Sequence, residues 1–316
     1  MTAAPTAAAD TRAAVTGTPR GGAPAPDRAA RTRRPRSMRS RVVSVLLAAS
    51  AVVIFAMSVF PVYWMVNTSL QPNAQVRGSE VHFWPENGSL QNYVDIIFHY
   101  ERAPFLPALA NSLQITLLTV LITLVFAFLA AVAVTRFRFR SRVSFIITIL
   151  IIQMIPAEAM IISMFRVMDS WHLLNSIAGL TLVYVATVLP FTIWTLRGFV
   201  DGVPADLEEA AMIDGLSRTQ AFWRITFPLL APGLVATGVF GFIQAWNEFV
   251  FALVINPRPE AMTLPVWLRT FLDPNGGTDW AQLMAGSTLI AIPVVVFFLI
   301  VQNRMTSGMV SGAVKG

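Results

Sequence analysis

Six long apolar runs limit what this chain can fold into more than any other feature. A helix needs about 20 consecutive apolar residues to cross the hydrocarbon core of a bilayer. Runs of this kind cover residues 42–66, 113–134, 145–165, 177–196, 229–255 and 283–301. None of them alternates between apolar and polar residues with the period of two that a strand shows. The sequence therefore predicts an all-α membrane protein with six transmembrane helices.

The composition agrees with a lipid environment and excludes several kinds of site. Hydrophobic residues make up 55% of the 316 residues and charged residues 13%, whereas a soluble domain carries about 25% charged residues. The chain has no cysteine, which excludes disulfides and thiolate metal sites. Its three histidines, His82, His99 and His172, lie far apart in the sequence, so no metal site is expected.

The placement of the arginines predicts the orientation of the chain, because Lys and Arg concentrate on the cytoplasmic side of membrane proteins. Nine arginines lie between Arg12 and Arg41, four lie in the loop at 135–144, and three lie between Arg197 and Arg224. The loops on the other side together carry only five arginines. Both termini and the loop between the fourth and fifth runs are therefore expected in the cytoplasm.

The apolar runs also predict how the chain is divided. Residues 1–40 are arginine-rich and lack a periodic apolar pattern, so we expect a disordered cytoplasmic leader. The first helix, at 41–70, is expected to be an uncleaved anchor, because no convincing signal-peptide cleavage site follows it. An extracellular loop at 71–107, partly ordered, would lead to the main transmembrane domain at 108–303. A cytoplasmic tail at 304–316 completes the chain.

A polar segment at 204–228 interrupts the apolar pattern between the fourth and fifth runs. Pro204 and the acidic residues that follow it favour the start of a helix. Gly215 can take the left-handed conformation that ends a helix. Ser217 and Gln220 have the spacing of a capping box, which would start a second helix. The segment is therefore predicted to be a helical hairpin.

The first arm of this hairpin carries small and apolar side chains at helical spacing. Leu207, Ala210, Ala211 and Asp214 fall at i, i+3, i+4 and i+7, which places them on one face. Residues 222–225 add further apolar contacts. An ordinary hairpin lying on the membrane surface would also be helical. The small residues and exposed apolar side chains favour a docking module for a cytoplasmic partner.

The stretch EAAMIDGLSRTQAFWRITFP at 209–228 resembles the cytoplasmic loop of permease subunits in binding-protein-dependent ABC importers. The pattern Glu-Ala-Ala, then Gly, then Ile-x-Leu-Pro is present except that Phe227 replaces the leucine. Four further segments are similar to the carbohydrate branch of these permeases, and in particular to the smaller permease of maltose-type importers. They lie at 61–70, 108–116, 245–253 and 311–316.

This resemblance implies the transmembrane domain of a type I ABC importer in a bacterial plasma membrane. The hairpin would sit in a cleft of an ATPase subunit and pass its closing motion to the transmembrane helices. The implied partners are a second homologous permease subunit, two ATPase subunits that bind ATP and Mg, an extracellular sugar-binding protein and membrane lipid, without nucleic acid. The residues implied in ATPase coupling are Leu207, Glu209, Ala210, Ala211, Asp214, Gly215, Phe222, Ile225 and Pro228.

The chain itself does not have the residues of an ATPase. A phosphate-binding P-loop needs a lysine after its glycine-rich turn, and the only lysine in this sequence is Lys315. We therefore expect no cofactor and no enzymatic activity in this chain, and expect the energy for transport to come from partner subunits.

Acidic and amide side chains within two of the runs form a candidate substrate path. Ionisable groups at membrane depth usually face a cavity or the interior of the bundle. Glu158 and Glu248 each lie roughly 10 Å from the outer end of their run, at about 1.5 Å per residue, so they could line one chamber. Gln244, Asn247 and Glu248 share one helical face at i, i+3 and i+4. Groups that only satisfy one another in helix packing would show the same pattern, so both interpretations stay open at this point.

Prolines inside the runs predict bends, because proline lacks the backbone N–H that a helix uses. They are Pro61, Pro156, Pro190 and Pro293. Such bends could act as hinges, although bends that serve only packing are as common.

Three other functions compete with sugar import. The same machinery could carry a different solute, such as a polyamine, phosphate or sulfate. A self-sufficient secondary transporter would show internal repeats and discontinuous helices, and no repeat relates the two halves of the sequence. An intramembrane enzyme would need a nucleophile and base or metal ligands at depth, and no histidine lies in any run.

Overall fold

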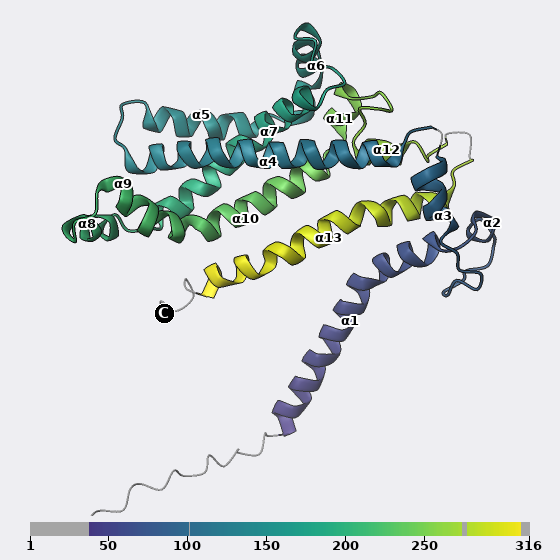
Figure 1. Cartoon of the computed structure of the whole chain (residues 1–316). Coiled ribbons are helices and arrows are strands. Elements are labelled where there is room, and N and C mark those ends of the chain that lie inside the picture. The colour runs from purple at the N-terminus through teal and green to yellow at the C-terminus, as the bar shows by residue number, and fades with distance from the viewer. Residues whose placement is uncertain (1–37, 101, 274–276, 311–316) are drawn as a thin grey trace, which may run out of the picture. The chain divides into compact units, whose positions relative to one another are not determined.

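The computed structural model describes residues 38–100, 102–273 and 277–310, and in these residues it contains helices and no strand (Figure 1). The prediction of an all-α fold is confirmed. Most of the expected leader and the similarity at 311–316 lie outside the described residues. The five longest helices in the described part are α1 (Met38–Ser69), α4 (Phe105–Arg136), α7 (Ile177–Asp201), α10 (Phe227–Trp246) and α13 (Trp280–Val310).

Shorter helices connect the long ones. Two of them, α8 and α9, form the hairpin that the sequence predicts, and a π-helical turn, η3, joins this hairpin to α10. The short elements are α2 (Asn73–Val76), α3 (Gln91–Val94), η1 (Asp95–His99), α5 (Arg142–Met154), η2 (Ala157–Met160), α6 (Ile161–Ser170), α8 (Asp206–Ile213), α9 (Arg218–Ala221), η3 (Phe222–Thr226), α11 (Val250–Ile255) and α12 (Leu264–Arg269).

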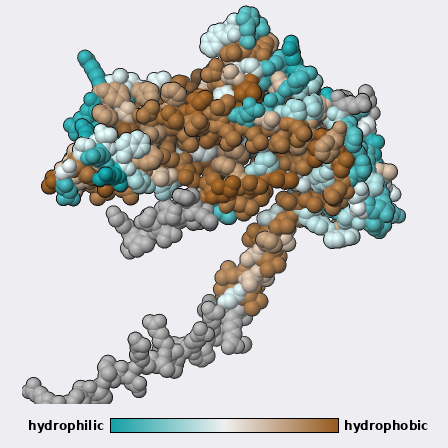
Figure 2. Space-filling view, in the orientation of Figure 1, coloured by the Kyte–Doolittle hydropathy of each residue, from teal (hydrophilic) through white to brown (hydrophobic). Residues whose placement is uncertain are grey.

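The chain divides into two compact units, Met1–Ala56 and Met57–Gly316. The described part of the first unit is the amino-terminal portion of α1, which is apolar as a membrane-spanning helix must be. The second unit holds the rest of the described helices. Figure 2 shows hydrophobic residues along the middle of the second unit and hydrophilic residues at its two ends, which is the distribution expected of a bundle that spans a bilayer.

Five helical segments in the described residues are long and apolar enough to cross a membrane, and one bent pair of helices would make a sixth. One of the five runs from Arg218 to Trp246, because the second arm of the hairpin continues into α10. The hairpin is therefore mechanically continuous with a membrane-spanning helix.

The third expected span, at 145–165, is a broken helix, and the bend predicted at Pro156 is confirmed. Helix α5 ends at Met154, and the pair formed by α5 with η2 and α6 is bent by 89°. Pro156 explains the break, because proline disfavours helical geometry in the residue before it. Ile155 is accordingly extended, with φ −78° and ψ 121°. The other three predicted proline sites lie inside continuous helices.

The fifth expected span, at 229–255, is also interrupted. Helix α10 ends at Trp246, and α11 begins at Val250 after three residues outside any helix. The expectation of one helix through residues 229–255 is therefore wrong, and the break includes Asn247 and Glu248, two of the three residues predicted to share a helical face.

The core of the second unit is centred on α4 and α7, which make the most extensive contact between two elements, with α10 packed against both. Ala127 and Ala131 of α4 pack with Leu196 of α7 in one buried cluster. At Gly233 of α10, an added Cβ would lie 2.5 Å from the Phe199 ring, so only glycine allows this approach. Small residues at such contacts let membrane helices pack closely.

The end of the second unit away from the hairpin is closed by folded connections. Trp267 of α12 is fully buried, and its indole N–H donates to the carbonyl of Ala103 at 3.0 Å. The Asn92 side chain donates to the carbonyl of Ser69 at 2.8 Å. We call this the opposite end, and the end formed by α8 and α9 the hairpin end (Figure 1).

Candidate functional site

The turn of the hairpin forms as its local sequence predicts. Gly215 has φ +95°, in the left-handed region that favours glycine. The N–H groups of Leu216 and Gly215 donate to the carbonyls of Ala211 and Met212, each at 3.1 Å. These two hydrogen bonds are those of a Schellman motif, which ends α8. The prediction of a helix end at Gly215 is confirmed.

The second arm starts with the predicted capping box. The backbone N–H of Gln220 donates to Ser217 Oγ at 3.3 Å, and the backbone N–H of Ser217 donates to Gln220 Oε1 at 3.0 Å. The π-helical turn η3 then carries the chain from α9 into α10. A π-helical turn inside a helix is uncommon and is often found at functional positions.

A polar cluster of three side chains fastens the hairpin to the bundle, and sequence reasoning missed it. Glu208 of α8 accepts a hydrogen bond from the hydroxyl of Thr226 at 2.6 Å. Arg136, at the end of α4, has its Nη2 3.7 Å from Glu208 Oε1 and donates to the carbonyl of Val203 at 2.8 Å. The Arg136 and Glu208 side chains are only 15% and 14% exposed. We call Arg136, Glu208 and Thr226 the anchor triad.

A signal for this cluster is present in the sequence. Glu208 stands three residues before Ala211, so the two share a helical face, and an alanine suits a face that packs closely. The local sequence predicts only that Glu208 is a charge near the start of a helix and that Arg136 marks the cytoplasmic side. The structure shows that the two charges neutralise one another across 72 residues of sequence.

The four residues of the predicted face of α8 differ in exposure. Ala211 is buried, with 8% exposure, whereas Leu207 is 43% exposed. The reason is that α8 packs on α9 and η3 with Glu208 and Ala211 turned inward. The exposed residues of α8 and its turn include Leu207, Glu209, Ala210, Met212, Ile213, Asp214 and Gly215.

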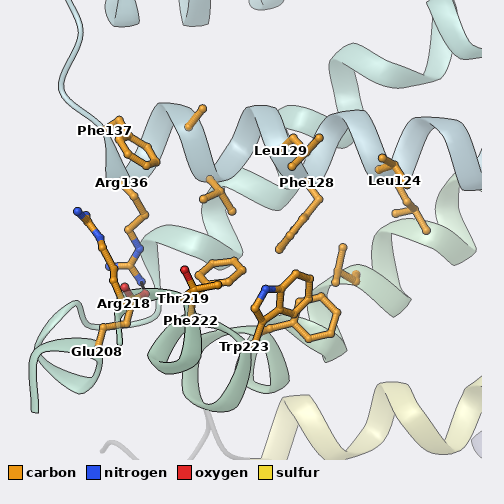
Figure 3. Close-up of a pocket in the computed structure, with 15 residues that line it drawn as sticks. Leu124, Phe128, Leu129, Arg136, Phe137, Glu208, Arg218, Thr219, Phe222 and Trp223 are labelled. Atoms are coloured by element: carbon orange, nitrogen blue, oxygen red, sulfur yellow. Dashed lines mark ion pairs between the residues drawn. The ribbon is translucent and has the colours of Figure 1, made fainter. Parts of the chain in front are cut away.

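The aromatic part of the hairpin lies beside a cavity. Phe222 is half-buried and its ring centroid lies 6.1 Å from that of Phe128 on α4. The cavity has a volume of about 720 Å³ and is lined by α4 and by the hairpin (Figure 3). Trp223 borders it, while Arg136 and Glu208 stand at its polar edge. Of the other predicted coupling residues, Ile225 is half-buried and Pro228 is exposed.

The candidate substrate path contains no single helical face. Gln244 is exposed near the end of α10, while Asn247 lies just beyond it and donates to the carbonyl of Ile243 at 2.9 Å. Glu248 uses both carboxylate oxygens to accept the N–H groups of Phe251 at 2.8 Å and Ala252 at 3.0 Å. The expectation that Gln244, Asn247 and Glu248 share a helix face is therefore wrong, because the helix ends first.

Glu158 is exposed in η2, directly after the break at Pro156. The two breaks border the same part of the core. Ala157 and Phe249, the neighbours of Glu158 and Glu248, pack against the same buried cluster. Among the described residues, no group of three or more His, Cys, Asp or Glu side chains could hold a metal ion.

A polar cavity of about 370 Å³ at the opposite end was not predicted. Asn111 of α4 donates to the carbonyls of Glu260 at 2.9 Å and Met262 at 3.1 Å. The neighbouring Ser112 hydroxyl accepts from the N–H of Leu264 at 2.7 Å. The sequence does not predict this contact, because the loop that Asn111 binds lies about 150 residues later in the chain.

Comparison with known families decides what kind of protein this arrangement belongs to. The model of the binding-protein-dependent transport system inner membrane component family matches residues 123–309, which include the hairpin, the anchor residues and both helix breaks. The chain belongs to this family. It is a permease subunit of an ABC importer, a transport component rather than an enzyme, and a multi-pass protein of the plasma membrane.

Curated relatives match most of the chain. The diacetylchitobiose uptake system permease protein DasC of Streptomyces coelicolor is 42% identical over 267 residues, which are 84% of this chain and 95% of the relative. The trehalose/maltose transport system permease protein MalG of Thermococcus litoralis is 34% identical, over 88% of this chain and 100% of the relative. The trehalose transport system permease protein SugB of Mycobacterium tuberculosis is 35% identical, over 82% and 93%.

Solved structures support the fold. A bacterial ABC transporter involved in the import of the acidic polysaccharide alginate has a chain that matches with a TM-score of 0.69 and 22% identity, over 84% of this chain and 98% of that one. A bacterial alginate ABC transporter in complex with its alginate pentasaccharide-bound periplasmic protein gives a TM-score of 0.60 and 15% identity, over 83% and 93%. The predicted ABC importer fold is confirmed.

Proposed function

We propose that this permease forms half of the path by which a sugar or oligosaccharide is imported, beside a second homologous permease subunit. Each of the three relatives described above is named for the uptake or transport of a small saccharide. The family depends on a binding protein, and one structural neighbour was solved with its ligand-bound periplasmic protein. We therefore assign the delivery of the sugar to an extracellular binding protein.

The hairpin is the observation on which this proposal rests. Its turn is fixed by Gly215 and the capping box, its first arm exposes apolar side chains, and its second arm continues into α10. Such an element can bind a partner and pass the movement of that partner to α10. We assign that partner to one of two ATPase subunits, which would bind ATP and Mg. Within the hairpin we assign direct contact with the ATPase to Leu207, Glu209, Ala210, Asp214 and Gly215.

The other predicted coupling residues have a supporting role in this proposal. Ala211 is buried in the hairpin, and Phe222 and Ile225 are half-buried toward the bundle. Pro228 stands in the first turn of α10. These four residues would hold the hairpin in shape while the exposed residues touch the ATPase.

The distribution of arginines supports a cytoplasmic hairpin end, with both termini on the same side. The opposite end would then face the binding protein. Along the path we assign solute contact to Glu158, Gln244 and Asn247, which are all exposed. Glu248 would shape the path by holding α11, because both of its carboxylate oxygens accept backbone N–H groups.

Uptake by a strain that lacks this chain tests the proposal. Cells are given labelled diacetylchitobiose, trehalose or maltose, with phosphate and a polyamine as controls. We expect the uptake of a saccharide to be lost, the controls to be unchanged, and the wild-type chain to restore uptake. Loss of phosphate or polyamine uptake, with every saccharide still entering, would contradict the assignment to sugar.

A Gly215→Asp chain in the same strain tests the hairpin. Gly215 has a φ of +95°, a conformation that L residues rarely adopt, so any side chain at this position strains the turn. We expect the variant to reach the membrane, to retain less ATPase when purified through a tag on this chain, and to lose at least about tenfold in uptake. Full uptake with the ATPase still bound would contradict the coupling role.

A further inference from the structure

We propose that the anchor triad, Arg136, Glu208 and Thr226, is the pivot through which movement of the hairpin reaches two membrane-spanning helices at once. This inference rests on the proposed coupling role of the hairpin. No resemblance or motif assigns a role to these three residues, and the sequence pattern of the hairpin starts one residue after Glu208.

Each member of the triad belongs to a different element. Glu208 lies on the first arm of the hairpin, Thr226 ends the π-helical turn that leads into α10, and Arg136 ends α4. Arg136 also donates to the carbonyl of Val203, in the connection between α7 and α8. A force on α8 is therefore transmitted by hydrogen bonds and an ion pair to α4 and to α10, and not only along the chain.

These contacts are of a strong kind. A hydroxyl that donates to a carboxylate at 2.6 Å makes a short, charge-assisted hydrogen bond. The Arg136 and Glu208 side chains are largely buried, so solvent screens their attraction less than it screens that of a surface pair. Removing one member would leave the other charge buried without its partner.

The rest of the contact between the hairpin and α4 is loose by comparison. The cavity of about 720 Å³ lies between them beside the contact of the Phe128 and Phe222 rings, and its walls are mainly apolar side chains such as Phe128 and Trp223 (Figure 3). Apolar contacts carry no fixed direction, and the cavity leaves room for displacement. The triad is the hydrogen-bonded attachment, while the other contacts, Arg218 over the Phe137 ring and Phe222 beside Phe128, are ring contacts next to open space. This is the geometry of a pivot.

The test uses the complex purified through a tag on this chain and reconstituted in vesicles with its binding protein and labelled sugar. Glu208→Gln keeps an acceptor for Thr226 but loses the charge opposite Arg136. Thr226→Val keeps the shape of the side chain but loses the donor. For both we expect the ATPase to stay bound, ATP hydrolysis to stay within about twofold, and sugar imported per ATP to fall about tenfold.

Two control variants are matched to this test. Thr226→Ser keeps the hydroxyl and is expected to import normally. Asp201→Asn removes the ion pair with Arg197, which joins residues four apart on α7 at 3.5 Å, and Asp201 is 47% exposed. The Arg197 side chain is 26% exposed. Since pairs of residues four apart on a helix contribute little, and this pair does not join the hairpin to another element, we expect no change in import per ATP.

A distance measurement separates a pivot from a merely structural role. The chain has no cysteine, so spin labels can be placed at Ile213→Cys on the hairpin and Leu121→Cys on α4, which are 87% and 61% exposed. In the wild type we expect one defined distance that shifts when ATP is added. In Glu208→Gln we expect a broad distribution of distances between the two labels. This distribution should no longer shift as a whole when ATP is added.

The proposal is overturned if Glu208→Gln and Thr226→Val import as much sugar per ATP as the wild type. It is also overturned if either variant loses the ATPase, because the triad would then serve docking. Failure of the coupling function itself looks different, since Gly215→Asp would then keep both the ATPase and full uptake.

Discussion

The hairpin end and the helix breaks near the opposite end use glutamates in the same two ways. At the hairpin, Glu208 is bound to neighbours within the chain while Glu209 is exposed. At the breaks, Glu248 is bound to the backbone of α11 while Glu158 is exposed. In each pair, one carboxylate holds the local structure in place by accepting hydrogen bonds within the chain. The other is exposed and can bind a partner or a solute. Residue type alone does not separate these roles.

The comparison predicts different phenotypes for the two carboxylates at the breaks, and the larger effect belongs to Glu248→Ala. This change leaves the N–H groups of Phe251 and Ala252 without their acceptors, and an unsatisfied buried donor costs about 1–3 kcal/mol. We expect the midpoint of thermal unfolding in detergent to fall by several degrees, with uptake reduced. Glu248→Gln retains one acceptor, so its unfolding midpoint should lie between those of the wild type and Glu248→Ala.

If Glu248→Ala unfolds at the wild-type temperature but loses uptake, Glu248 contacts the solute. The proposed difference between Glu248 and Glu158 would then be wrong. Thermal unfolding followed by tryptophan fluorescence is a suitable readout, since Trp246 is buried directly before the break.

The smaller effect is expected for Glu158→Gln. The side chain is exposed in η2, and substitutions at exposed positions typically change stability by less than about 0.5 kcal/mol. We expect an unchanged unfolding temperature and a change of about twofold in the rate of sugar uptake at limiting concentration. A fall in unfolding temperature as large as that of Glu248→Ala would show that Glu158 is structural as well.

The same two regions show what the sequence could predict. The turn at Gly215 and the capping box at Ser217 were predicted because each depends on residues within a few positions. The inward rotation of α8 was not, because it depends on Arg136, far away in the sequence. Exposed and buried glutamates look alike until packing is known.

The size of the first break and the existence of the second are hard to predict for a related reason. Pro156 predicts a bend within one span, but no neighbouring residue indicates that the helix turns by 89° there. The second break has no proline, and depends on a glutamate carboxylate that replaces helical hydrogen bonds at the start of α11. Hydropathy identifies long apolar runs, and both breaks lie inside such a run. Hydropathy alone therefore does not reveal them.

The most direct measurement of the central claim is site-specific photo-cross-linking from the tip of the hairpin. A photoreactive amino acid replaces Ile213, which is 87% exposed, and a second chain carries it at Leu121, which is 61% exposed on α4. In cells that import sugar, we predict an adduct between position 213 and an ATPase subunit, and none from position 121. An active transporter in which position 213 never reaches an ATPase would contradict the account.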